Sequence, residues 1–218
     1  MPVPGARTHD CDEHDGVSNK PLDLVDPAAI EHLFDVAAEL FAERGLDGVS
    51  VREISRASNV SIAAIYYHFK SKESLFAEVT LHRYEDFERE LLKRIGNEPS
   101  GHADPVKVAL AFFDMMIADD KLLRLLQRDM IAGSPDHRNF LSRHPFRHFR
   151  HLIDQMLGFD RQGALGAMKS FSFAAVLNGY SELVMADMDH VGEERAQYLR
   201  SHRDFLEQFV RQAFASMP

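Results

Sequence analysis

The sequence contains no tryptophan and a single cysteine, Cys11, among its 218 residues. One cysteine excludes both a disulfide framework and a zinc finger built on several cysteines. No apolar run approaches the roughly 18 residues that a membrane span needs. Residues 1–20 also lack the apolar stretch of a secretory signal. We therefore expect a cytoplasmic protein with no membrane partner.

Positive charge is in the minority, because 25 Lys and Arg face 34 Asp and Glu, for a formal net charge of −9. Such a balance argues against a protein that coats nucleic acid through bulk charge, although a local basic surface remains compatible with it. Apolar residues make up 45% and charged residues 27%, which is ordinary for a globular chain. The 16 Phe and 9 Met supply bulk for a core.

Alternating apolar and polar residues, the mark of a half-buried strand, are missing as well. Apolar residues recur instead at helical spacing. After a disordered tail at 1–25, the pattern predicts helices over 27–44, 50–58, 61–67 and 71–95. A break rich in glycine and proline follows at 96–101, and further helices are expected near 104–118, 119–132, 145–158, 161–188 and 193–216. The sequence therefore predicts an all-α protein.

Capping signals delimit the short helices between residues 50 and 71. Ser50 and Glu53 form a capping box, in which each side chain satisfies a free backbone donor of the other residue. Asn59 is suited to a left-handed turn, while Ser61 and Ser71 can cap the helices that follow. Two short helices joined by such a turn form a helix-turn-helix, whose second helix enters the DNA major groove.

The residues of this motif resemble the DNA-binding domain of TetR-family transcriptional regulators. The resemblance covers about residues 28–76 and departs from the family pattern at Ser55, Ser58 and Asn59, which are all small or tolerant of turns. Ile54, Val60 and Ile65 are expected in its interior. The similar stretches are Phe41-Ala42-Glu43-Arg44-Gly45, Ser50-Val51-Arg52-Glu53-Ile54, Asn59-Val60-Ser61 and Tyr66-Tyr67-His68-Phe69-Lys70-Ser71-Lys72-Glu73-Ser74-Leu75.

The resemblance implies a domain at 26–75 that binds a double-stranded DNA operator. Phosphate contacts fall on Tyr67, His68 and Lys72, with Tyr66 partly in the interior. Residues 50–72 carry four Lys or Arg against one Glu, a net +3, so the remainder carries −12. The base-reading positions have apolar side chains that suit thymine methyl groups, and Arg52 is the candidate for a guanine contact. The full set of expected DNA contacts is Arg52, Ser61, Ile62, Ala63, Ala64, Tyr66, Tyr67, His68 and Lys72.

Residues 76–218 are expected to form the helical domain that the family uses for dimerisation and effector binding. Residues 164–188 are apolar nearly all round, and such a helix must be buried on every face. With the last helix, which presents a seam including Phe205 and Phe209, it predicts a four-helix homodimer interface. Phe and Met form adaptable walls for a small-molecule effector. The expected pocket residues are Phe112, Met116, Met130, Phe149, Met156 and Phe171.

A stripe of Arg143, Arg147 and Arg150 flanks the apolar face of one predicted helix. It offers a site for an anionic ligand group, and a solvated or salt-bridged surface is the alternative.

The predicted function is that of a ligand-responsive regulator, a repressor released from a palindromic operator by an apolar or amphipathic effector. A helical metal enzyme is an alternative suggested by 12 His, but the chain lacks the paired Glu-x-x-His motifs of such sites. A helix-turn-helix adaptor without a ligand is another. We expect no catalytic activity, cofactor or metal.

Overall fold

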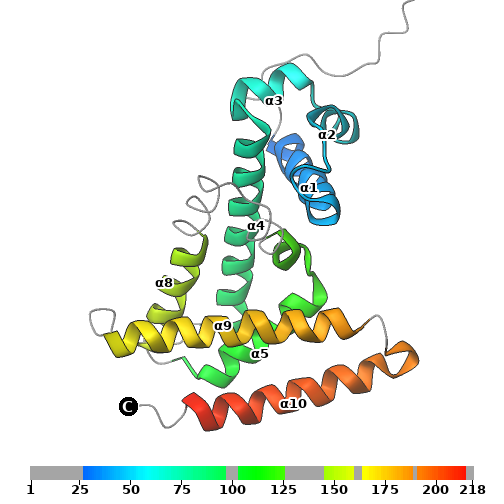
Figure 1. Ribbon diagram of the computed structural model, residues 1–218. Coiled ribbons are helices and arrows are strands. Elements are labelled where there is room, and N and C mark those ends of the chain that lie inside the picture. The colour runs from blue at the N-terminus through cyan, green and yellow to red at the C-terminus, as the bar shows by residue number, and fades with distance from the viewer. Residues whose placement is uncertain (1–26, 97–102, 126–144, 160–163, 189–190, 215–218) are drawn as a thin grey trace, which may run out of the picture.

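The computed structural model describes residues 27–96, 103–125, 145–159, 164–188 and 191–214 (Figure 1). Within these ranges the chain forms helices and no β-strand, which confirms the all-α prediction; residues 121–125 are helical too. The expected tail at 1–25 and the continuation of a helix to 132 lie outside the described residues. The elements are α1 (Pro27–Arg44), α2 (Val51–Ser58), α3 (Ile62–Phe69), α4 (Lys72–Ile95), α5 (Pro105–Ala118), α8 (Pro145–Leu157), α9 (Ala164–Asp187), the 3-10 helix η3 (Gly192–Glu194) and α10 (Arg195–Phe214).

The predicted caps set the helix boundaries. The Ser50 hydroxyl accepts a hydrogen bond from the Glu53 amide at 3.3 Å, and a Glu53 carboxylate oxygen accepts one from the Ser50 amide at 2.9 Å. Ser61 and Ser71 cap α3 and α4. Asn59 is left-handed, with φ of 55°, as expected from the ease with which asparagine adopts this conformation. These contacts fix the short helices of the N-terminal domain.

Two hydrophobic cores are joined by the long helix α4, which runs from α3 to α5 in Figure 1. The first turns of α4 contribute Phe76 and Val79 to the N-terminal core. Its last turns contribute Leu91 and Ile95 to the C-terminal core. The N-terminal core thus extends beyond the predicted boundary at residue 75, and one continuous helix serves both domains.

Residues 119–125 return from the end of α5 to the N-terminal domain. Leu125 is fully buried in the N-terminal core, although it lies some fifty residues beyond the helix-turn-helix. Lys121 Nζ lies 2.7 Å from Glu39 Oε2 of α1. This segment therefore forms a second connection between the two domains, alongside α4.

Helices α9 and α10 lie at the end of the molecule opposite α3 (Figure 1). One side of α9 packs Phe173, Leu177 and Val184 into the C-terminal core. Its other side is also apolar, as the sequence predicted, and is exposed to solvent in the single chain. No described helix combines the length and the apolar character needed to cross a bilayer. The exposed large apolar residues of these two helices are Leu165, Met168, Phe171, Leu183, Phe205 and Phe209.

Candidate nucleic-acid interface

The turn between α2 and α3 is held by a small core and by two serine hydroxyls. Ile54, Val60 and Ile65 are all buried, as predicted. Ser55 Oγ donates a hydrogen bond to the carbonyl of Val60 at 2.6 Å, and Ser58 Oγ donates one to the carbonyl of Ile54 at 2.7 Å. The two serines that depart from the family pattern thus satisfy buried carbonyl groups of the motif itself.

Helix α3 presents one exposed face, made by Ile62, Ala63, Tyr66 and Tyr67. Their spacing places them on the same side of the helix. Tyr66 is 48% and Tyr67 64% exposed, so Tyr66 is about half covered, in keeping with its expected partial burial, and Tyr67 is open to solvent. Ala64 is only 3% exposed and packs in the N-terminal core, which corrects its assignment as a base-reading residue.

Ser61 also lies inside the motif rather than on its surface. It is 6% exposed, and its hydroxyl accepts a hydrogen bond from the Ala64 amide at 3.1 Å. This contact is that of an N-cap, which satisfies a free amide at the start of a helix. Ser61 therefore positions α3, which corrects its assignment as a direct DNA contact.

The expected phosphate-contacting residues lie around the joint between α3 and α4. Lys72 Nζ donates a hydrogen bond to the carbonyl of Val49 at 3.1 Å, which holds the start of α4 against the turn before α2. An ammonium group has three donors, so two remain for a phosphate. His68 is half-buried, with its ring 5.1 Å from that of Tyr67. Lys72 and Tyr66 line one open hollow of about 430 Å³ beside that turn.

Arg44 is a positioning residue that the sequence patterns did not reveal. Its Nη1 lies 2.9 Å from Glu53 Oε1 and links the last turn of α1 to the first turn of α2. The Ser50 amide and hydroxyl, followed by Arg44, lower the pKa of Glu53 to about 2. The capping box is thus also an anchor between helices. Arg44 lies nine residues before Glu53 in the sequence, and no local motif links two residues at that spacing.

Arg52 and Arg56 are exposed on α2, next to this anchor. Neither forms an ion pair with the carboxylates in the part of the chain that the structure describes. Arg52 is therefore available for the base contact that the sequence predicts.

Gly48, in the turn between α1 and α2, is expected to be intolerant of any side chain. A Cβ at this position would lie 2.3 Å from the carbonyl oxygen of Arg44, so the backbone would have to shift. We expect Gly48→Ala to destabilise the protein by about 1–3 kcal/mol, as other over-packed sites do. Thermal denaturation measures this loss, with Asp47→Ala at the preceding exposed position as the control. Equal melting temperatures for the two variants would contradict the expected clash.

The expected effector-pocket residues divide into three groups. Phe112, Met116 and Met156 are buried in the C-terminal core. Phe171 is 71% exposed on the outer face of α9, which corrects its assignment to a pocket within this domain. Met130 lies outside the described residues, as do the side chain of Phe149 and the arginine stripe. Among the residues that the structure describes, no group of His, Cys, Asp or Glu is arranged to hold a metal ion.

Comparison with known proteins identifies the helix-turn-helix. Residues 33–79 match the family model described as "Bacterial regulatory proteins, tetR family". The N-terminal domain belongs to the TetR family. Over 49 residues the chain is 45% identical to the HTH-type transcriptional regulator AcrR of Shigella flexneri. Over 47 residues it is 49% identical to the HTH-type transcriptional repressor KstR2 of Rhodococcus jostii.

Each of these alignments spans 22% of the chain and 23% of the relative, so both are confined to the TetR-type domain. Solved structures extend the similarity of fold to most of the chain. The fatty acid degradation regulator FadR of Bacillus halodurans has a TM-score of 0.64 at 16% identity, and the alignment covers 86% of this chain and 98% of that one. FadR of Bacillus subtilis in complex with stearoyl-CoA has a TM-score of 0.63 at 16% identity, covering 81% and 97%.

Proposed function

We propose that this protein is a cytoplasmic, ligand-responsive transcriptional regulator. In this proposal a homodimer represses transcription by binding a palindromic operator, and a small amphipathic effector releases it. The observation that carries the proposal is the exposed face of α3, presented by a capped helix-turn-helix within a TetR-type domain. Its functional residues would contact DNA and an effector, and none is assigned a catalytic role.

The DNA contacts that we propose follow from exposure and chemistry. Ile62 and Ala63 offer apolar surface to thymine methyl groups, while Arg52 has the paired donors that recognise guanine. Tyr67 and Lys72 offer hydroxyl and ammonium donors to phosphates. The net +3 of residues 50–72 favours the approach of this end of an otherwise acidic chain to DNA.

The proposed dimer interface is the exposed apolar face of α9 and α10. Tyr180 of α9 stacks on Phe205 of α10, with ring centroids 5.9 Å apart, and Phe205 is followed by the ring of Phe209 at 6.3 Å. Burial raises the pKa of the Tyr180 hydroxyl to about 12. Large contiguous apolar patches on soluble proteins mark interaction sites. A second copy related by two-fold symmetry would present the same face, which supports pairing of α9 and α10 across the axis.

An amphipathic effector is supported by two separate features. The C-terminal core is rich in Phe and Met, including Phe112, Met116 and Met156, and such side chains adapt to apolar ligands. A protein of similar fold, FadR of Bacillus subtilis, was solved with stearoyl-CoA. We further propose that Arg143, Arg147 and Arg150, whose side chains lie outside the described part of the structure, supply cations for an anionic head group; a solvated surface is the alternative that the sequence leaves open.

Selection of duplexes from a random pool, followed by titration with stearoyl-CoA, tests the proposal. We expect the selected duplexes to contain inverted repeats, and stearoyl-CoA to weaken their binding at least tenfold. Stearyl alcohol, which has the chain but no anionic group, is the control ligand. Recovery of no preferred duplex would overturn the proposal. Operator binding that no acyl thioester or lipophilic acid alters would instead favour the adaptor that needs no ligand.

A further inference from the structure

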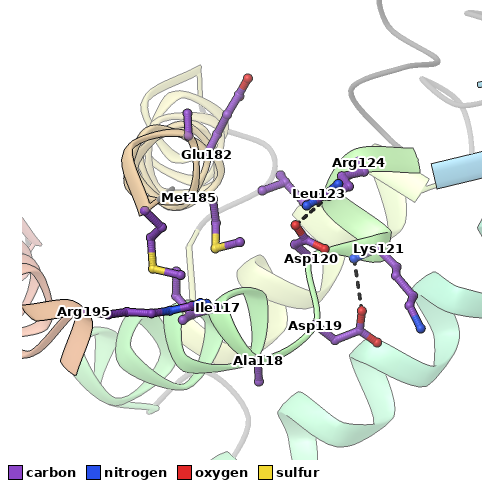
Figure 2. Close-up of a pocket in the computed structure, with 12 residues that line it drawn as sticks. Ile117, Ala118, Asp119, Asp120, Lys121, Leu123, Arg124, Glu182, Met185 and Arg195 are labelled. Atoms are coloured by element: carbon purple, nitrogen blue, oxygen red, sulfur yellow. Dashed lines mark hydrogen bonds and ion pairs between the residues drawn. The ribbon is translucent and has the colours of Figure 1, made fainter. Parts of the chain in front are cut away.

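A pocket of about 830 Å³ opens where four parts of the C-terminal domain meet (Figure 2). These are the end of α5, residues 119–125, the last turns of α9 and the start of α10. Its volume lies within the range of small-molecule sites. The pocket opens beside the hydrophobic core of this domain. Leu123 and Met188 belong to the same buried cluster as Phe112 and Met156, but neither Phe112 nor Met156 lines the pocket. Its apolar lining includes Ile117, Leu123, Met185 and Met188.

Most of the charged groups in this pocket are already engaged. Arg124 Nε lies 2.6 Å from Asp120 Oδ2, and Asp119 Oδ1 accepts a hydrogen bond from the Lys121 amide at 3.1 Å. The Lys121 ammonium pairs with Glu39 outside the pocket. These pairs account for both cations of residues 119–125 and leave them little capacity for a ligand.

Arg195 differs from the other cations. It pairs with no carboxylate in the described part of the chain, and Figure 2 shows its side chain extended toward Ile117. Glu182, on α9, points away from it in the same view. The pocket therefore combines several apolar side chains with a guanidinium that pairs with no carboxylate among the described residues. A guanidinium forms strong, charge-assisted hydrogen bonds with a carboxylate.

We propose that this pocket binds an anionic amphipathic molecule, with a carboxylate against Arg195 and an apolar chain along Ile117, Met185 and Met188. Methionine side chains are flexible and adjust to chains of different shape. The charge of Arg195 and the apolar wall select for an acid rather than for a neutral lipid or a polar anion.

The same pocket lies directly against the segment that connects the two domains. Residues 119–125 form one wall, while Leu125 is buried in the N-terminal core and Lys121 pairs with Glu39 of α1. The hydrogen bond with Glu39 raises the pKa of Lys121. A ligand that displaces this wall would change the position of α1 and the affinity for DNA. The site stands on its own geometry, whereas its effect on DNA rests on the proposed function.

Dodecanoate is the probe for this site, and the methyl groups of the nine methionines are the reporters. We expect NMR shifts at Met185 and Met188 that are much smaller in Arg195→Gln, whereas shifts at Met116 or Met156 would report the core site of the proposed function and should persist in that variant. Arg195→Gln should weaken dodecanoate binding roughly tenfold or more, the loss of one charge-assisted hydrogen bond. Arg200→Gln, which removes an exposed arginine from the same helix outside the pocket, should leave the affinity unchanged. Dodecanol should bind wild type as weakly as dodecanoate binds Arg195→Gln.

Shifts at Met185 and Met188 that persist unchanged in Arg195→Gln, or equal losses of dodecanoate affinity for the two arginine variants, would overturn the site. A DNA titration separates that failure from failure of the proposed function. If dodecanoate shifts the NMR signals of Met185 and Met188 but never alters the affinity for DNA, the proposed site is supported and the proposed coupling to DNA is wrong. Glu39→Gln, which lies outside the pocket, should preserve dodecanoate binding and reduce its effect on DNA. An undiminished effect would overturn the proposed route through Lys121.

Discussion

Phe171→Glu and Leu183→Glu should each convert the proposed dimer into monomers and remove tight operator binding. Both side chains are more than two-thirds exposed on the outer face of α9 in the single chain. In a two-fold dimer each substitution places a carboxylate in the interface twice. Replacing a central aromatic anchor costs about 2 kcal/mol or more, and an unpaired buried charge adds to that loss. We expect the dimer dissociation constant to rise at least thirtyfold.

Leu92→Glu is the matched control, because it adds the same charge at an apolar residue that is 43% exposed on α4. Sedimentation at micromolar concentration measures the oligomeric state, and titration with an inverted-repeat duplex measures binding. Leu92→Glu should remain dimeric and bind as wild type. If all three variants sediment as wild type, the interface lies elsewhere. If the α9 variants become monomeric and still bind the repeat tightly, two-fold binding is wrong.

Local structure is where the sequence predicted most successfully. The capping residues bond to backbone groups only three or four positions away along the chain. The local sequence around Ser50, Glu53, Asn59 and Ser61 therefore determines where α2 and α3 begin and end. The observed bonds are those that the pattern predicts. Contacts between distant segments were not predictable in this way. The pair of Lys121 with Glu39 joins residues about eighty positions apart, and Leu125 is buried in a core about fifty or more positions away, so no local pattern records either contact.

The corrected site residues show why a motif assigns a face of a helix only approximately. Ala64 and Tyr66 lie two residues apart on α3, and a rotation of the helix exchanges which of them is buried. The structure places Ala64 in the N-terminal core and leaves the larger Tyr66 about half exposed. Phe171 was assigned to a pocket for its bulk, but bulk favours an interface between subunits equally. Only the exposed position of Phe171 on α9 favours a subunit interface over the wall of a pocket.

Arg52→Ala should weaken operator binding by about 1–3 kcal/mol per half-site, and only for duplexes that keep the base pair it reads. A bidentate contact with guanine has this magnitude, and an inverted repeat presents it twice. The loss on random duplexes should be much smaller, because the remaining phosphate contacts carry no sequence information. Titration of wild type and variant with the selected operator and with a random duplex gives the two losses. Equal losses would assign Arg52 to the phosphates.

Lys72→Gln is the matched comparison, because it removes a charge but keeps a donor for the carbonyl of Val49. It should weaken binding to all duplexes by a similar factor. It should also reduce the slope of the logarithm of affinity against the logarithm of salt concentration by about one unit for each half-site. Since Ile62 and Ala63 provide no hydrogen bond to bases, the remaining discrimination must come from methyl contacts and DNA shape. Replacing thymine by uracil within a half-site should therefore reduce affinity for wild type and for Arg52→Ala alike. If uracil has no effect at any position of the half-site, the exposed apolar face of α3 does not contact thymine methyl groups. DNA shape alone must then account for the remaining sequence discrimination.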